Sequence, residues 1–99
     1  MGILSVDLQE GFSDDTVVLH LNGEEVYRQE HVATMRILGL ADSFTTNIEE
    51  GPATLDIAVE TQGIARTVPL DVTGDIYLGV SLVAGDLETF VSSEALGYA

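Results

Sequence analysis

The 99-residue chain is predicted to form one all-β domain, an antiparallel β-sandwich of about seven or eight strands. Three observations predict this fold. Short segments alternate between apolar and polar residues, turn signals separate them at about 8–12-residue spacing, and 45% of the residues are hydrophobic, enough to build a core. A second domain does not fit in this length, so we expect a single domain over residues 1–99.

The clearest strand covers residues 53–60, where apolar and polar side chains alternate with a period of two. The same period predicts strands near residues 4–8, 17–21, 44–48, 64–72 and 76–82. Their inward side chains are expected to be Leu4, Val6, Leu8, Val17, Leu19, Leu21, Phe44, Thr46, Ile48, Leu55, Ile57, Val59, Ile64, Val68, Leu70, Val72, Ile76, Leu78, Val80 and Leu82. Pro69 lacks an N–H, so its strand should be an edge strand or contain a bulge.

Two hairpins are marked by turn residues. Asn22-Gly23 favours a type I′ turn and predicts a strand over residues 25–29. Regular pairing then directs Val26 inward and Tyr27 outward, on the same outer face as Val18.

The second hairpin turns at Ala84-Gly85 and places Gly79 opposite Phe90, where the ring can cover the bare glycine backbone. Residues 31–41 fit either a short helical turn or a crossing between sheets. The overall pattern resembles immunoglobulin-like or prealbumin-like sandwiches, and a small closed barrel is the alternative.

The charge is strongly one-sided. Seventeen acidic residues face three arginines, and the net charge is −14. Such a surface repels nucleic acids and anionic membranes, so we expect neither as a partner. It attracts cations or basic proteins, or serves as a solubilising surface suited to high salt. No cysteine is present, which excludes disulfides and thiol catalysis.

The location is expected to be cytoplasmic. The first four residues lack the basic leader of a secretory signal, and no apolar run approaches the roughly 20 residues of a membrane span.

Successive loops of an antiparallel sandwich alternate between its two ends. The second, fourth and sixth connections therefore bring one set of carboxylates to the same end, which suggests a calcium site: Glu24, Glu25, Glu49, Glu50, Asp71 and Asp75. The alternative is that these acids are ordinary solvated turn residues. No other cofactor is expected. The opposite end carries Glu10, Asp14, Asp15 and Asp86, and Ser13-Asp14-Asp15 is expected to form a turn bonded by its side chains.

Catalytic patterns are missing from the sequence. His20 and His31 are the two imidazoles, and His20 is expected to pair with Glu25 on the sheet surface. No Gly-x-Ser-x-Gly elbow, P-loop or dinucleotide pattern occurs, so we expect no enzyme. A small hydrolase, the second alternative, would need a cleft uniting a histidine with a serine or carboxylate. Arg66 and Arg28 are expected to form structural ion pairs.

Outward-facing apolar residues are the remaining clue to function. The set comprises Val18, Tyr27, Tyr77, Gly79 and Phe90, and Val83 and the apolar residues 95–99 add to it. A contiguous apolar patch rimmed by acids is typical of an interface. We therefore expect a non-catalytic acidic interaction or assembly module that binds a protein partner or a second copy. A calcium- or carbohydrate-binding β-sandwich module is the alternative.

Overall fold

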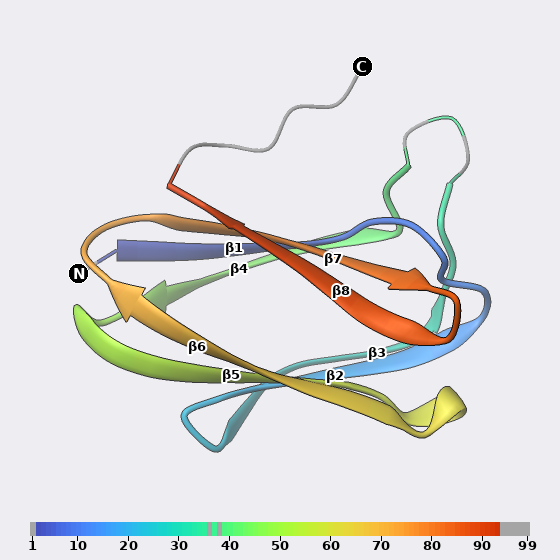
Figure 1. Ribbon diagram of the computed structural model, residues 1–99, viewed down its shortest axis with the longest axis horizontal. Coiled ribbons are helices and arrows are strands. Elements are labelled where there is room, and N and C mark those ends of the chain that lie inside the picture. The colour runs from blue at the N-terminus through green and yellow to red at the C-terminus, as the bar shows by residue number, and fades with distance from the viewer. Residues whose placement is uncertain (1, 36, 38, 94–99) are drawn as a thin grey trace.

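The computed structural model describes residues 2–35, 37 and 39–93, and the fold seen there is the predicted sandwich. Two separate sheets face each other, and the chain does not close into a barrel (Figure 1). The described elements are β1 (Gly2–Leu8), β2 (Asp15–Leu21), β3 (Glu24–Val32), β4 (Asp42–Ile48), β5 (Gly51–Val59), the 3-10 turn η1 (Glu60–Gln62), β6 (Ile64–Val72), β7 (Ile76–Val83) and β8 (Asp86–Ser92).

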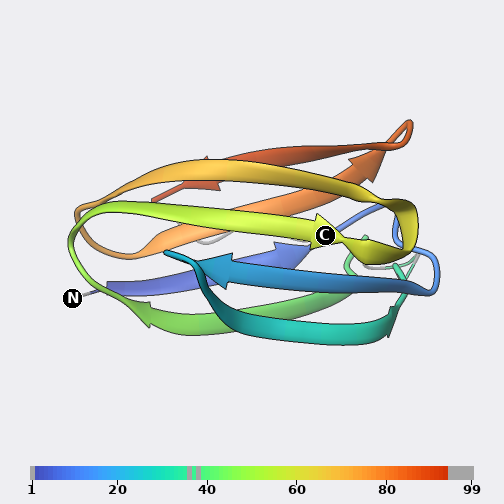
Figure 2. The same ribbon diagram turned by 90° about the horizontal axis from the view of Figure 1, so that it is seen from below.

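Each sheet contains four strands. The β1 sheet has the order β4-β1-β7-β8, and the β2 sheet has the order β3-β2-β5-β6. Figure 2, seen from below, has the β2 sheet in front. All neighbouring strands are antiparallel except β1 and β7, which are parallel. In the immunoglobulin order the first two strands are neighbours; here they lie in different sheets, so the strand order differs from the immunoglobulin one.

The core lies between the sheets, where the alternating apolar residues meet. The predicted inward residues of the central strands are confirmed as buried: Leu4, Val6, Leu8, Val17, Leu19, Leu55, Ile57, Val59, Ile76, Leu78, Val80 and Leu82. Phe12, from the loop after β1, joins this cluster at 4% exposure. Each large apolar side chain buried in this way stabilises the fold by about 1.5–3 kcal/mol relative to the exposed state.

The first hairpin turns where predicted but continues with a different register. Asn22 and Gly23 both have positive φ, as a type I′ turn requires. The pairing of β2 with β3 shifts between Leu19 and His20, which places Tyr27 opposite Leu19 and leaves Val26 as an extra residue. The prediction that Tyr27 faces outward is therefore wrong. The bulge reverses the parity of the strand, and Tyr27 packs against the core.

The two open sides of the sandwich are bridged by different contacts. Between β3 and β4, the Tyr27 hydroxyl donates to the carboxylate of Asp42. The Tyr27 ring lies 5.2 Å from the ring of Phe44, between centroids. Between β6 and β8, the Arg66 guanidinium donates to the carbonyl oxygen of Leu87 at 3.3 Å. Arg66 thus reaches out of the edge strand β6, and a backbone carbonyl accepts its hydrogen bond in place of the expected carboxylate.

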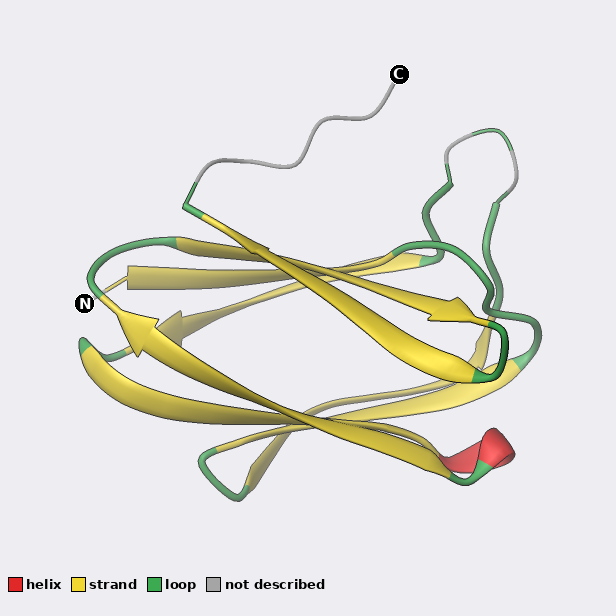
Figure 3. Cartoon of the chain, in the orientation of Figure 1, coloured by secondary structure: helices red, strands yellow, loops and turns green. Residues whose placement is uncertain are grey.

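Residues 31–41 turn back without a helix in their described part. Met35 and Leu40 form an isolated bridge, and the Gly39 N–H donates to the Met35 carbonyl at 2.8 Å. Figure 3 shows this segment as a loop at one end of the sandwich, with the short η1 in red. The described part of the chain contains no helix that is long and apolar enough to cross a membrane.

Candidate interaction surface

The outer face of the β1 sheet carries three of the five residues predicted for the interface. Gly79 lies opposite Phe90, as expected, and Tyr77 lies opposite Ser92. Phe90 is 63% exposed, whereas Tyr77 is half-buried. On β1, the outward neighbour of Tyr77 is Ser5. An aromatic ring therefore stands on a sheet face among small polar side chains.

Gly79 itself is not an open depression, because another side chain covers it. A Cβ atom built on Gly79 would lie 2.7 Å from Oε1 of Gln9. Gln9 follows β1, and its backbone N–H donates to the Val80 carbonyl at 2.7 Å, which holds it against β7. Hence the Gln9 amide fills the space over Gly79, and Phe90 remains exposed beside it.

Strand β8 is an edge strand with apolar side chains on both faces. Phe90 is 63% exposed on the outer face, and the next residue, Val91, is 49% exposed although it lies opposite Leu78 on the inner face. The other edges carry features that oppose pairing with another chain. Strand β3 has a bulge, β6 contains Pro69, and β4 directs polar side chains outward.

The other two predicted interface residues belong to the β2 sheet. Val18 lies on the outer face of that sheet, opposite Arg28 and Ala58, but is only 1% exposed. Arg28 extends from β3 across β2 to Glu60, at 3.1 Å, and also binds Glu25 at 2.9 Å. Its side chain therefore crosses above Val18, so the expectation that Val18 is available to a partner is wrong.

The Arg28 ion pairs confirm the structural role expected for this residue. Hydrogen bonds from the guanidinium to Glu25 and Glu60 raise the pKa of Arg28. Glu25 is opposite His20 in the register, but its carboxylate binds Arg28. His20 therefore lies beside Glu25 in the register, as expected, but the Glu25 carboxylate binds Arg28 and not His20.

The six carboxylates predicted to bind calcium do lie at one end, but they do not gather at one point. The turns at residues 22–23, 49–50 and 73–75 all lie on the left in Figure 1. Glu24, Glu49 and Glu50 border one hollow, whereas Asp71 and Asp75 border another.

Two of these acids are also engaged elsewhere. Glu25 binds Arg28, and Asp75 accepts a hydrogen bond from the Ile3 N–H at 2.9 Å. In residues 2–35, 37 and 39–93, no three histidine, cysteine or acidic side chains are grouped so that they could hold a metal ion. The expectation that the six carboxylates converge is wrong, because the strand ends keep the turns apart.

At the opposite end, Asp15 forms the predicted side-chain-bonded turn. Its carboxylate accepts hydrogen bonds from the Ser13 N–H at 2.9 Å, the Thr61 hydroxyl at 2.7 Å and the Gln62 amide at 3.1 Å. Burial of Asp15, which is 3% exposed, raises the pKa of the carboxyl, but these three donors outweigh it and the pKa lies below its usual range. Asp15 is therefore a structural carboxylate that ties the first loop to the turn after β5.

His31 and Asp14 form an exposed pair at the same end. The Nδ1 atom of His31 lies 2.6 Å from a carboxylate oxygen of Asp14, and the side chains are 80% and 76% exposed. The hydrogen bond to Asp14 and its negative charge raise the pKa of His31. Both residues have a positive φ, near 59° and 55°, and nothing in the sequence indicated that the chain would bring them together.

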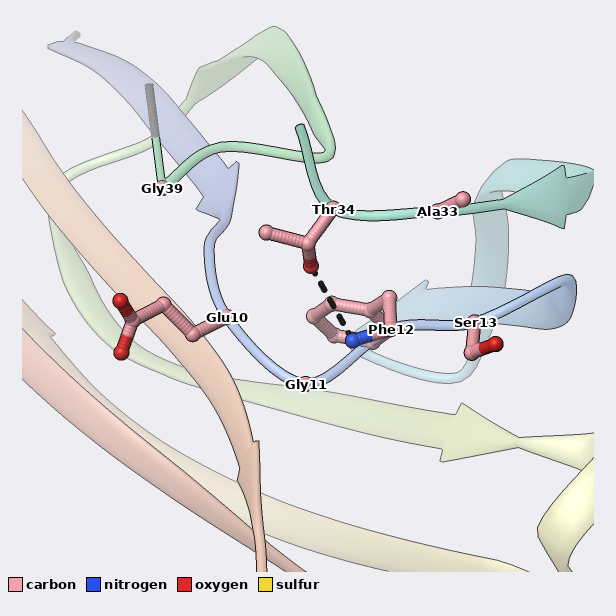
Figure 4. Close-up of a pocket in the computed structure, with 7 residues that line it drawn as sticks. All are labelled: Glu10, Gly11, Phe12, Ser13, Ala33, Thr34 and Gly39. Carbon is pink, nitrogen blue, oxygen red and sulfur yellow. Dashed lines mark hydrogen bonds between the residues drawn. The ribbon is translucent and has the colours of Figure 1, made fainter. Parts of the chain in front are cut away.

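A hollow of about 570 Å³ lies beside these loops and is lined by residues of the first and third connections (Figure 4). The Thr34 hydroxyl accepts a hydrogen bond from the Phe12 N–H at 3.1 Å and donates to the Gln9 carbonyl at 2.7 Å, so it links the two loops. Among the described residues that line it, Glu10 is the one titratable side chain. The hollow thus combines one carboxylate with hydroxyl and apolar groups, and neither histidine lines it.

No family model, curated protein or solved structure significantly matches the chain. The apolar residues 95–99, which the sequence added to the expected interface, lie outside the described residues.

Sequence reasoning missed two features of the surface. Val91 belongs to the inward-facing set of β8 by alternation, yet it is 49% exposed, which a period of two does not predict. Tyr27 changes face because of a bulge, which the turn residues alone do not encode.

Proposed function

We propose that this chain is a non-catalytic interaction or assembly module that associates with a second copy through the β7–β8 edge of the β1 sheet. The observation that carries the proposal is the exposure of two consecutive apolar residues on an edge strand, Phe90 at 63% and Val91 at 49%. An edge strand has unpaired backbone groups that can extend the sheet into another chain.

The chemistry of the edge supports a reversible association. Val83, at the end of β7, is 44% exposed and adds apolar area to the same hairpin. Asp86 and Glu88 on β8 place negative charges at its margin. Two copies bring these charges together, so the association should strengthen when salt screens them. We place the module in the cytoplasm, which agrees with the lack of cysteine in a small domain.

Sedimentation velocity of the wild type and two variants tests this function. The first variant, Phe90→Ser, removes the exposed ring. The second, Ile37→Ser, is the matched control, because Ile37 is 93% exposed but lies in the loop between β3 and β4. We expect the wild type and Ile37→Ser to sediment as dimers at high protein concentration, and Phe90→Ser to sediment as a monomer.

A wild type that remains monomeric at high protein and salt concentration would contradict the proposal. So would equal association of the wild type and Phe90→Ser. If Ile37→Ser alone dissociates, the association runs through the other end of the sandwich and the β7–β8 edge is not the interface.

A further inference from the structure

The side of the sandwich between β6 and β8 is closed at one end and open at the other. The two edge strands are bridged near their starts, where Arg66 donates to the Leu87 carbonyl. Towards their ends lies a pocket of about 280 Å³, which residues of both sheets line. The pocket therefore reaches the space between the two sheets.

Part of the pocket lining is apolar. Leu70 and Ile76 contribute to it from the core cluster, at 5% and 6% exposure. Val91 also lines it and lies on the inner face of β8, yet it is 49% exposed. Covering apolar surface of this kind is favourable by about 25 cal/mol per Å² removed from water.

The rim of the pocket is acidic. Asp71 is at the end of β6, and Asp75 is in the connection to β7, where the Ile3 N–H holds it in place at 2.9 Å. None of the described residues that line the pocket is basic. The lining therefore favours a ligand that has both an apolar portion and a positive charge, and it disfavours an anion.

We infer that this pocket receives a lysine side chain of a different protein. A lysine joins a four-carbon apolar stem to a compact ammonium group, and it buries the stem while the charge stays near water. The pocket is slightly smaller than the roughly 300 Å³ at which small-molecule sites begin, which suits a single side chain. This chain contains no lysine, so the residue must come from another protein.

Short peptides provide the probe. The peptide acetyl-Ala-Lys-Ala-amide carries the lysine, and the same peptide with norleucine keeps a four-carbon stem without the charge. Binding is followed by shifts of backbone amide signals in ¹⁵N-labelled protein. We expect shifts around Asp71, Ile76 and Val91, and about fivefold weaker binding of the norleucine peptide, the effect of losing a partly exposed ion pair.

Two variants separate this pocket from general attraction to an acidic surface. Asp71→Asn removes one rim charge, and we expect it to weaken binding of the lysine peptide by about threefold. Glu88→Gln is the matched control, because it removes one charge from the outer face of β8, and we expect binding to be unchanged. Asp75→Asn is a second rim variant that keeps an oxygen acceptor for the Ile3 N–H.

Equal binding of the two peptides would overturn the inference, as would equal weakening by Asp71→Asn and Glu88→Gln. Shifts spread over the whole acidic surface would also overturn it. The titration is repeated on Phe90→Ser, in which the proposed self-association is removed. Val91 lies both in this pocket and at the proposed dimer edge, so binding by this variant tests the lysine pocket apart from the dimer, and no binding by it would overturn the inference.

Discussion

At the scale of single residues, the exposed pair of His31 and Asp14 makes the stability of the fold depend on pH. Its pKa is raised chiefly by the hydrogen bond to Asp14 and by the charge of that residue, and the charge of Glu30 adds a smaller effect. Because the pKa of the folded state is raised, the pair stabilises the fold below the ordinary histidine pKa near 6.5. This contribution is lost as the pH rises through the raised value.

The corresponding prediction concerns the titration of His31. Asp14→Asn should lower the pKa of His31, and Glu30→Gln should lower it by less, because Glu30 acts through its charge alone. An NMR titration of the imidazole signals measures both shifts. Equal shifts in the two variants would contradict the bonded geometry of His31 and Asp14.

At the scale of elements, the loop after β1 depends on a glycine that lies against β7. Gly11 has a φ near 90°, and a Cβ atom there would lie 1.9 Å from the carbonyl oxygen of Leu82. Gly63 also has a positive φ, near 65°, but no atom beyond its own chain neighbours lies within 4 Å of its Cβ position. An alanine at Gly63 therefore meets only backbone strain, whereas an alanine at Gly11 meets both backbone strain and steric overlap.

We expect Gly11→Ala to lower the free energy of unfolding by more than Gly63→Ala. The second variant meets only the unfavourable φ, which costs roughly 1 kcal/mol, whereas the first must also displace the end of β7. Chemical denaturation measures both. Similar losses in the two variants would show that the loop does not lie against Leu82 as described.

The sequence predicted the strands better than the contacts that the edge strands make. Alternation and the turn pairs Asn22-Gly23 and Ala84-Gly85 predicted the strands, because both signals are local. The bulge that turns Tyr27 inward depends on side-chain packing between β3 and β4, which no local pattern contains. For the same reason the sequence places Arg66 on a strand but does not predict which group accepts its hydrogen bond. That acceptor is the Leu87 carbonyl on the facing sheet.

Part of the candidate surface was predictable from the sequence. The pairing of Gly79 with Phe90 follows from one hairpin and is confirmed. The burial of Val18 is not predictable in this way, because it depends on the reach of Arg28 across a neighbouring strand to Glu60. The exposure of a residue on a sheet face depends on the long side chains around it and on whether its strand is an edge strand. The alternation of apolar and polar residues predicts neither.

At the scale of the whole molecule, the acidity should govern stability. Three arginines cannot neutralise seventeen acidic residues, so most carboxylates repel one another. We expect the midpoint of thermal unfolding to rise as potassium chloride is added, because salt screens this repulsion. A midpoint that does not change with salt would mean that the carboxylates are compensated locally.

The proposed association through β8 is tested most directly by the amide spectrum of the ¹⁵N-labelled protein during dilution in high salt. We expect concentration-dependent shifts that cluster on Tyr77, Gly79, Phe90 and Val91. Shifts clustered instead on Met35 and Ile37, or a spectrum that does not change with concentration, would contradict it.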